Sequence, residues 1–140
     1  MISIETQIRQ DPTILGLAGE LRQLFANLLN NSIDAVPHGG RIVIRVAHAQ
    51  ERSGAMRPGV RLTVCDNGPG IDAELRSKLF EPFFTTKKEV GTGLGLWVSS
   101  NVVRNHEGSM KLRSRTEAGK SWTVFSVFLP ARPASLPANG

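Results

Sequence analysis

The sequence predicts a two-layer α+β sandwich, in which helices pack on a mostly antiparallel sheet. Two long segments carry apolar residues at helical spacing, and four shorter runs have the character of strands. The strands occur as neighbouring pairs that are joined by turns rather than by crossover helices. This pairing argues against a doubly wound parallel sheet and favours two layers.

The first half of the chain is predicted to contain one long helix and two strands. The helix spans residues 18–36 and ends at 37–40, where a proline and two glycines stand. Strands follow at 41–46 and 60–65, joined by a polar hairpin loop at 50–59. The apolar residues that define the helix are Leu21, Leu24, Phe25, Leu28, Leu29, Ile33 and Val36.

The second half is predicted to add two helices and two strands. The elements are a short helix at 72–79, an irregular segment at 80–93, a long helix at 94–105, and strands at 110–114 and 122–129. Asp72 is placed to cap the short helix. Residues 1–130 are expected to form one domain, and the proline-containing tail 131–140 is expected to be disordered.

The composition is that of a globular domain, since 40% of the 140 residues are hydrophobic. Every apolar run falls short of the roughly 20 residues of a membrane span, and the N-terminus lacks the regions of a signal peptide. We therefore expect a cytoplasmic location and leave open whether a full-length protein is membrane-anchored. Cys65 is the single cysteine, which excludes an internal disulfide, and we expect it to pack as a small hydrophobic residue.

The net charge of +5 and the pI near 10.1 suit an anionic partner. The basic residues are nevertheless scattered, and only Lys87 and Lys88 lie within a candidate site. Because no helix carries a basic stripe interleaved with aromatic residues, we expect no nucleic-acid binding.

Residues 27–31 place three asparagines on the first helix. Asn27 and Asn31 are four residues apart and therefore point the same way. An amide oxygen is a hard, neutral ligand that suits Mg²⁺ bound together with substrate phosphates. The alternative is that these asparagines only face solvent. Asparagine is a weak helix former, so three of them within five residues favour the metal.

The second strand closes with the sequence Asp-Asn-Gly-Pro-Gly. Asp66 shares its face with the apolar Leu62 and Val64, where a carboxylate needs a hydrogen-bond donor. The amino group of adenine would serve, and Gly68 and Gly70 would let the backbone approach a flat ring. Taken alone, however, an ordinary turn explains this segment better.

Residues 91–96, Gly-Thr-Gly-Leu-Gly-Leu, open the second long helix. The first-turn amides and the dipole of a helix can hold phosphates. The spacing matches neither the dinucleotide fingerprint nor a Gly-Lys-Ser phosphate loop, and a flexible linker is the alternative. The preceding residues 79–88 carry three phenylalanines and two lysines, as in a mobile lid whose lysines reach phosphates.

In this order, the three segments supply ligands for a metal, a base and phosphates, and so they point to ATP binding. The chain resembles the catalytic and ATP-binding domain of bacterial two-component sensor histidine kinases, in the Bergerat-fold ATPase superfamily. The resemblance covers residues 19–130 and rests on four motifs. They are the N box at 27–31, the first glycine box at 66–70, the F box at 80–84 and the second glycine box at 91–96.

The resemblance implies three main helices on a mixed, mostly antiparallel sheet of about five strands. It also implies that Asn27 and Asn31 are catalytic, with Mg²⁺ coordinated by Asn31 and the phosphates supported by Asn27. Asp66 would bind the adenine amino group with assistance from Thr123. The implied nucleotide-binding residues are Asn27, Asn31, Asp34, Asp66, Gly68, Gly70, Ile71, Phe83, Thr85, Lys87, Gly91, Thr92, Gly93, Leu94, Gly95, Leu96 and Thr123.

Some positions depart from the family pattern. Trp122 stands where a glycine commonly precedes the threonine, and Glu107 replaces a usual glycine after His106. Asp34 occupies a position where many members carry lysine, which removes one candidate phosphate contact. The lid segment is also short, which limits its contribution to phosphate coordination.

The resemblance implies phosphoryl transfer rather than hydrolysis. Gyrase, chaperone and mismatch-repair relatives carry a glutamate base at the position of Asn27, and an asparagine cannot take a proton from water. We therefore expect slow hydrolysis and transfer of the γ-phosphoryl group of ATP to a histidine. Glu20 lies two turns from Asn27 and is expected to be structural or solvated.

The acceptor histidine is expected on a separate dimerisation domain, because no dimerisation helix precedes residue 18. His106 matches a family histidine at the end of the last helix and is expected to be structural. The chain is thus expected to be an excised, monomeric domain, with that dimerisation domain and a response regulator as partners. A stand-alone ATPase and a degenerate nucleotide-binding module are the alternatives.

Overall fold

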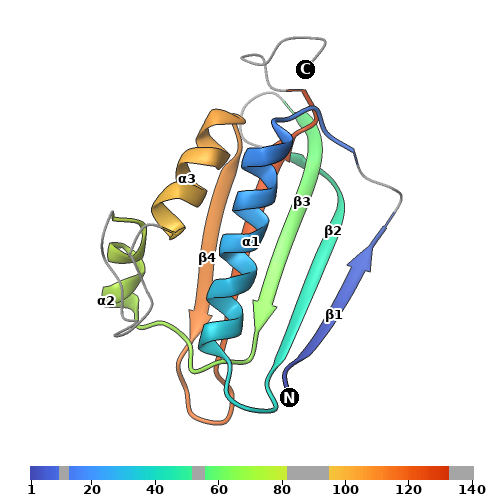
Figure 1. Cartoon of the computed structure of the whole chain (residues 1–140). Helices are drawn as coiled ribbons and strands as arrows, with labels where there is room; N and C mark the ends of the chain where they lie inside the picture. The colour runs from blue at the N-terminus through green and yellow to red at the C-terminus, as the bar shows by residue number, and fades with distance from the viewer. Residues whose placement is uncertain (10–12, 52–55, 82–94, 133–140) are drawn as a thin grey trace.

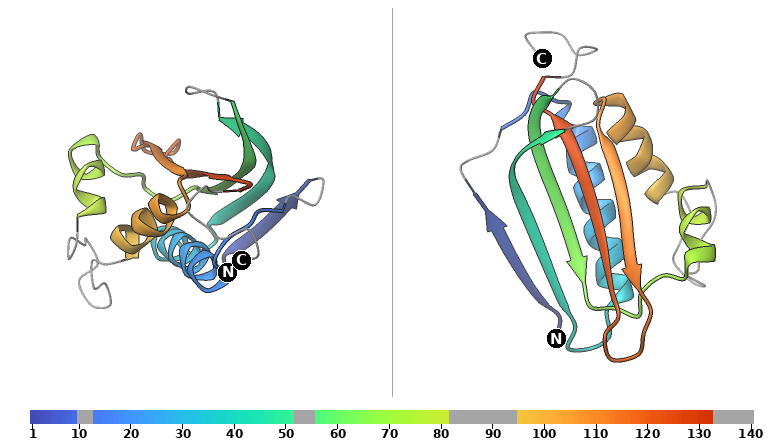
Figure 2. Two further views of the ribbon diagram at one scale, coloured as in Figure 1. Left: turned by 90° about the horizontal axis from the view of Figure 1, so that it is seen from above. Right: turned by 180° about the vertical axis from the view of Figure 1, so that it is seen from behind.

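The computed structural model describes residues 1–9, 13–51, 56–81 and 95–132. Its two long helices lie over one face of a five-stranded sheet (Figures 1 and 2). The expected sandwich of three helices on a mixed, mostly antiparallel sheet is confirmed. In chain order the elements are β1 (Ser3–Ile8), α1 (Ala18–Ala35), β2 (Arg41–Glu51), β3 (Arg57–Asp66), α2 (Ala73–Arg76), the 3₁₀ helix η1 (Lys78–Phe80), α3 (Gly95–Asn105), β4 (Ser109–Arg115) and β5 (Trp122–Pro130).

The strand order is β1-β2-β3-β5-β4. β1 pairs in parallel with β2, and the other three pairs are antiparallel. Because β5 lies between β3 and β4, the end of β3 meets the start of β5. Asp66 thereby stands opposite Thr123, so the sheet itself brings together two residues that are 57 positions apart.

The edge strand β1 was missed by the sequence analysis. Its apolar residues remain open to solvent, with Ile4 48% exposed and Ile8 66% exposed. Pairing with β2 holds the strand instead, beginning with a 2.9 Å hydrogen bond from the Ser3 amide to the Gly40 carbonyl. A strand fixed by backbone pairing at an edge leaves a weak apolar pattern in its sequence.

The predicted hairpin is confirmed by the antiparallel pairing of β2 with β3, but the predicted loop bounds of 50–59 are too wide, because β2 continues to Glu51 and β3 begins at Arg57. Gly59 belongs to the ladder, and a Cβ built on it would lie 2.2 Å from the Leu129 carbonyl oxygen. The neighbouring Pro58 carbonyl accepts a 3.0 Å hydrogen bond from the amide of Ala131. A glycine that resembles a turn residue is therefore needed here for the close approach of β5.

The predicted helix at 72–79 is divided into α2 and η1. Asp72 occupies the N-cap position of α2, but its side chain makes no capping hydrogen bond, so that expectation is wrong. Arg76 fixes this segment instead, donating to the carbonyl oxygens of Ile71 at 3.1 Å and Ser114 at 2.7 Å.

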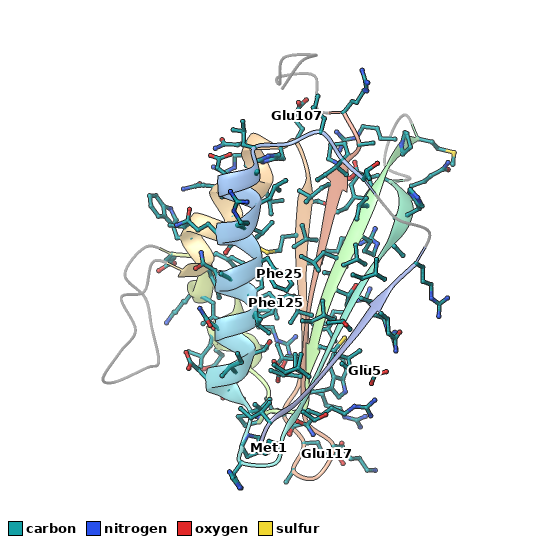
Figure 3. All side chains as sticks on the ribbon, turned by 45° about the vertical axis from the view of Figure 1, so that its right-hand side comes forward. Met1, Glu5, Phe25, Glu107, Glu117 and Phe125 are labelled. Atoms are coloured by element: carbon teal, nitrogen blue, oxygen red, sulfur yellow. The ribbon has the colours of Figure 1, made fainter. Side chains whose placement is uncertain are left out.

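The core lies between the two long helices and the sheet, where Phe125 is fully buried (Figure 3). Within the described residues, no helix is both long and apolar enough to cross a membrane. The predicted irregular segment and disordered tail fall largely on 82–94 and 133–140, outside the described residues. The core side chains are Leu24, Leu28, Val36, Ile42, Ile44, Leu62, Val64, Leu96, Val102, Val103, Phe125, Val127 and Leu129.

Candidate functional site

The candidate site is built around Asp66, the last residue of β3. The alternation of the strand turns Asp66 inward with Leu62 and Val64, and only 4% of the residue is exposed. The sequence prediction that this carboxylate shares the core face is confirmed. A carboxylate in such a place needs hydrogen-bond donors to offset its lost hydration.

Among the described residues, only one oxygen of Asp66 accepts a hydrogen bond. Oδ1 accepts a 2.9 Å hydrogen bond from the amide of Gly68, whereas Oδ2 is buried and receives none from the described residues. Burial raises the pKa of Asp66, and the Gly68 amide and the nearby Ser32 hydroxyl partly oppose this rise. A buried, unpaired acceptor is uncommon in a finished core and marks a place where a donor is missing.

Ser32 was missed by the sequence analysis and lies beside this carboxylate. It is fully buried on α1 near Asp66, and its Oγ has no hydrogen bond of good geometry among the described residues. Its position continues the apolar series of Leu24 and Leu28 at a spacing of four residues. A hydroxyl at the end of an apolar helix stripe is the signal that would have identified it.

The two predicted glycines have a clear steric reason, which comes from the protein itself. A Cβ on Gly68 would lie 2.9 Å from the Ala35 carbonyl oxygen. Gly70 has φ of +82°, and its Cβ would lie 2.2 Å from the Arg115 carbonyl oxygen. Both glycines therefore let the end of β3 pass close to α1 and to the β4–β5 hairpin.

Thr123 is buried beside Asp66 and belongs to a hydroxyl network that the sequence analysis did not find. Its Oγ1 lies 2.9 Å from Ser114 Oγ on β4. Ser114 Oγ also accepts a 2.7 Å hydrogen bond from the amide of Ile71 and lies 2.9 Å from the Trp122 carbonyl oxygen. The network thus joins the segment after Gly70 to β4 and β5.

Two of the departures from the family pattern, Trp122 and Glu107, are accommodated by the fold. Trp122 precedes Thr123 in β5, so its side chain points to the opposite face of the sheet and leaves Thr123 directed at the site. Glu107 has φ of +59°, the left-handed conformation that favours glycine at a helix end. Trp122 therefore does not displace Thr123 from the site. The backbone strain at Glu107 lies just after α3, away from the site.

Four predicted residues line one hollow of about 300 Å³. Asn31 and Asp34 reach it from α1, and Gly70 and Ile71 reach it from the segment after β3. The apolar Leu79 forms part of its wall. The structure therefore brings residues of the first motif's helix and of the second motif together at one hollow.

Asn27 and the start of α3 lie next to each other. Asn27 Nδ2 donates a 3.2 Å hydrogen bond to the carbonyl of Gly95, the first residue of α3. Leu96 directs its side chain into the core rather than into the hollow. The remaining predicted residues, Phe83, Thr85, Lys87, Gly91, Thr92, Gly93 and Leu94, lie outside the described residues.

His106, Glu20 and Cys65 lie apart from this site. The fully buried His106 accepts a 3.0 Å hydrogen bond from the Leu17 amide at Nε2, and its Nδ1 lies 2.8 Å from the Val102 carbonyl. Glu20 points toward the same end of α1, 3.9 Å from His106 Nδ1. Cys65 is half-buried on the opposite face of the sheet, and burial raises the pKa of its thiol.

Comparison with known sequences places these features in context. A family model described as "Histidine kinase-, DNA gyrase B-, and HSP90-like ATPase" matches residues 16–133. Sporulation kinase A of Bacillus subtilis is 35% identical over 132 residues, which cover 94% of this chain and 20% of that protein. Sensory histidine kinase/phosphatase NtrB of Rhodobacter capsulatus is 34% identical over 142 residues, covering 97% of this chain and 39% of NtrB. The chain therefore spans less than half the length of these relatives.

Solved structures share the fold. The catalytic domain of histidine kinase ThkA, in a nucleotide-free form, aligns with a TM-score of 0.78 at 29% identity, covering 96% of this chain and 82% of that chain. Full-length ShkA in complex with AMPPNP aligns with a TM-score of 0.72 at 28% identity, covering 98% of this chain and 27% of that chain.

Proposed function

The chain belongs to the family of histidine kinase-, DNA gyrase B- and HSP90-like ATPases, as a catalytic, ATP-binding domain of the sensor histidine kinase type. From this premise we propose that it transfers the γ-phosphoryl group of ATP to a histidine on a separate dimerisation domain. The observation that carries the proposal is the buried Asp66 carboxylate, whose Oδ2 has no donor among the described residues.

Asp66 would recognise the base. The exocyclic amino group of adenine is a donor that fits an unpaired, buried carboxylate oxygen, and binding would relieve the cost of burying it. Thr123 is paired with Asp66 across the sheet, and Ser32 lies near the same carboxylate, so both bring hydroxyl groups to the site. Gly68, Gly70 and Ile71 would complete the adenine pocket.

Asn31 would hold Mg²⁺ together with the phosphates, and Asn27 would support those phosphates. Asn31 and Asp34 line the hollow and offer hard oxygen ligands, while no cluster of three acidic, histidine or cysteine residues occurs in the described part of the chain. This donor set fits Mg²⁺, which keeps several waters and is shared with substrate phosphates. When bound, the metal would neutralise phosphate charge. Further contacts with the nucleotide would come from Thr85, Lys87 and residues 91–96. Phe83 would also contact the nucleotide.

Asn27 favours transfer over hydrolysis. Its amide donates to the Gly95 carbonyl, and an amide cannot remove a proton from water. In the transfer, the bond between the γ-phosphorus and the bridging oxygen breaks, a bond to an imidazole nitrogen forms, and ADP leaves. Positioning and charge neutralisation would supply the catalysis.

We propose that the partners are a histidine-containing dimerisation domain of the same kinase and, further along, a response regulator. The isolated domain would be a cytoplasmic monomer. Because the chain spans only part of its relatives, these assignments concern the kinase of which it would be the catalytic portion.

The test is a transfer assay in which this chain is mixed with dimerisation domains, Mg²⁺ and radiolabelled ATP. We expect acid-labile, base-stable label on the dimerisation domain and slow release of free phosphate without it. Asn27→Ala should reduce transfer, while Glu74→Gln, an exposed position on α2 that does not line the hollow, should not. Rapid ATP turnover without a partner would support the stand-alone ATPase, and absence of ATP binding would support a degenerate module.

A further inference from the structure

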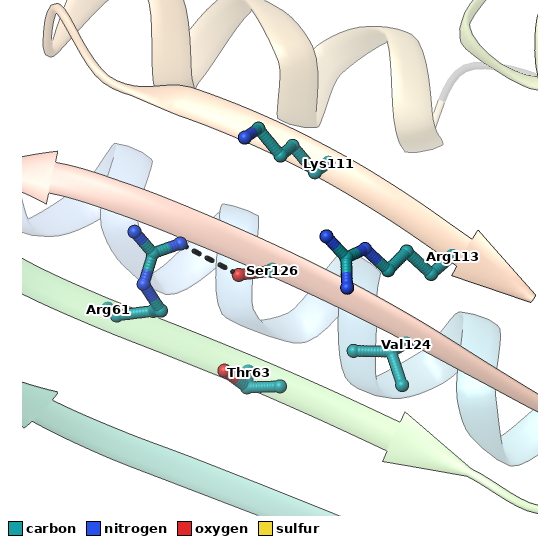
Figure 4. Close-up of a pocket in the computed structure, with 6 residues that line it drawn as sticks. All are labelled: Arg61, Thr63, Lys111, Arg113, Val124 and Ser126. Carbon is teal, nitrogen blue, oxygen red and sulfur yellow. Dashed lines mark hydrogen bonds between the residues drawn. The ribbon is translucent and has the colours of Figure 1, made fainter. Parts of the chain in front are cut away.

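The two long helices leave one face of the sheet open (Figure 2). This open face carries a hollow of about 370 Å³, apart from the nucleotide site. Its wall includes three cationic side chains: Arg61 on β3, and Lys111 and Arg113 on β4 (Figure 4). Residues Thr63, Val124 and Ser126 form the rest of the lining. The proposed function uses none of these side chains.

The sheet register explains why the cations gather. Thr63 and Lys111 are paired with Ser126 from its two sides, and Arg113 is paired with Val124 one row further along. Side chains two residues apart on a strand lie about 7 Å apart on the same face. The small Val124 and Ser126 of β5 therefore leave a depression between the longer cations of β3 and β4.

Arg61 is held in place at the edge of this depression. Its Nη1 donates a 3.0 Å hydrogen bond to Ser126 Oγ, and its guanidinium lies 5.9 Å from the centre of the Phe128 ring. Phe128 is itself fully buried, although it lies outside the main core cluster. A guanidinium has five donors, so most of them remain available to an anion.

Three other arginines of this face differ from these cations because each has a carboxylate partner, while Arg45 on β2 donates a 3.0 Å hydrogen bond to Gln7 Oε1. Arg41 pairs with Glu5 at 2.6 Å, Arg57 with Glu51 at 2.8 Å, and Arg115 with Glu117 at 2.6 Å. In the parts of the chain that the structure describes, neither Arg61, Lys111 nor Arg113 has a carboxylate partner. Cations gathered without counter-charge raise the local positive potential and attract anions. The lining of the hollow does not include the paired Arg41, Arg57 and Arg115.

We propose that this hollow, which we call the cationic hollow, is a docking site for an acidic segment of a partner protein. Carboxylates on alternate residues of an extended segment recur at the same spacing of about 7 Å as Lys111 and Arg113. One carboxylate could therefore contact Lys111 and the next could contact Arg113. Arg61 would contact the segment from β3, and the hydroxyl groups of Thr63 and Ser126 could donate further hydrogen bonds.

A nucleic acid fits this face less well. Nucleic-acid binding by charge commonly engages roughly six to ten phosphates. Only three cations line the hollow in the described part of the chain, and Glu5, Glu51 and Glu117 place carboxylates beside Arg41, Arg57 and Arg115. A longer phosphate chain would meet those carboxylates, whereas a short acidic segment would not.

The test uses a short, fluorescein-labelled oligo-glutamate peptide and measures fluorescence anisotropy at low and at physiological ionic strength. The variant Lys111→Gln/Arg113→Gln removes two cations of the hollow. Its matched control, Arg22→Gln/Arg104→Gln, removes the same charge from exposed positions on α1 and α3. ATP affinity and circular dichroism report on the fold, and amide chemical shifts locate the peptide.

We expect the hollow variant to lose roughly tenfold in peptide affinity while the control keeps it, because each exposed ion pair contributes modestly. Peptide-induced shifts should centre on Thr63, Lys111, Arg113 and Ser126, with ATP affinity unchanged in both variants. Equal losses in the two variants would overturn the proposal, since net charge alone would then explain binding. Tighter binding of a single-stranded oligonucleotide of equal charge at the same amides would also overturn it.

Discussion

Asp66 and His106 are both buried polar residues, and they lie near opposite ends of α1. His106 engages both ring nitrogens, one with the amide of Leu17 just before α1 and the other with a carbonyl of α3. Asp66 lies near Ser32 at the other end, and one of its carboxylate oxygens has no donor in the described part of the chain. The two residues are almost equally hidden from solvent but differ in how fully they are bonded.

This difference separates a structural residue from a binding residue. A buried polar group that is fully hydrogen-bonded rigidifies the fold, whereas an unsatisfied one costs stability. His106 therefore holds the end of α3 to the start of α1. Asp66 carries a cost that a ligand with a donor group would remove.

The largest expected effect is a loss of protein stability when His106, whose two ring nitrogens are both hydrogen-bonded, is replaced. His106→Ala should lower the free energy of unfolding by roughly 3 kcal/mol, because it removes a buried ring and leaves the Leu17 amide unpaired. Chemical denaturation would measure it, with the exposed His38→Ala as control. A variant that is as stable as the wild type would show that His106 does not hold the two helices together.

The next largest effect is a pH dependence of protein stability that arises from Asp66. Burial raises the pKa of Asp66 above its usual 3.8, so folding favours its protonated form. Its contribution to stability is therefore complete below 3.8 and is lost as the pH rises from 3.8 through the raised folded-state value. Over that window the free energy of unfolding of Asp66→Asn should rise relative to that of the wild type. Parallel pH profiles for wild type and Asp66→Asn would contradict this account.

A smaller effect is expected at Ser32. Its hydroxyl is buried without a hydrogen-bond partner among the described residues, so Ser32→Ala should cost little stability. If that hydroxyl serves the ligand, ATP affinity should fall roughly two- to tenfold. Isothermal titration with ATP and chemical denaturation together would decide. Loss of stability without loss of affinity would make Ser32 a structural residue like His106.

The smallest effect is expected beyond His106, at the end of α3. Glu107 has the left-handed backbone that glycine adopts freely, so Glu107→Gly should raise the free energy of unfolding by about 0.5 kcal/mol. Glu107→Ala should bring no such gain, because alanine keeps the Cβ that causes the strain. ATP affinity should stay unchanged in both, and a change would mean that the structural end of α1 also influences binding.

The sequence predicted the parts of the fold that rest on apolar periodicity. The long helices α1 and α3 and the central strands carry strong patterns because their faces are buried against one another. β1 escaped prediction because its isoleucines stay largely exposed. Gly59 was misassigned because the approach of β5, which requires it, comes from residues far along the chain.

The candidate site likewise has features that the sequence predicts and features that depend on the tertiary fold. Asp66 could be predicted to be buried, because its place in the strand alternation is local information. That its two oxygens differ could not, since this depends on where α1 places Ser32 and where the chain turns back at Gly68. Ser114 and Thr123 likewise meet only through the β4–β5 pairing.

Our main proposal is that the amino group of a nucleotide base donates to Oδ2 of Asp66, which has no donor among the described residues. Its most direct test is isothermal titration of Asp66→Asn with ATP, alongside chemical denaturation at neutral pH. The asparagine can still accept the Gly68 amide, but its NH₂ would face the donor of adenine. We predict that ATP affinity falls by more than roughly tenfold while stability is kept or increased. ATP affinity close to that of the wild type would contradict the claim.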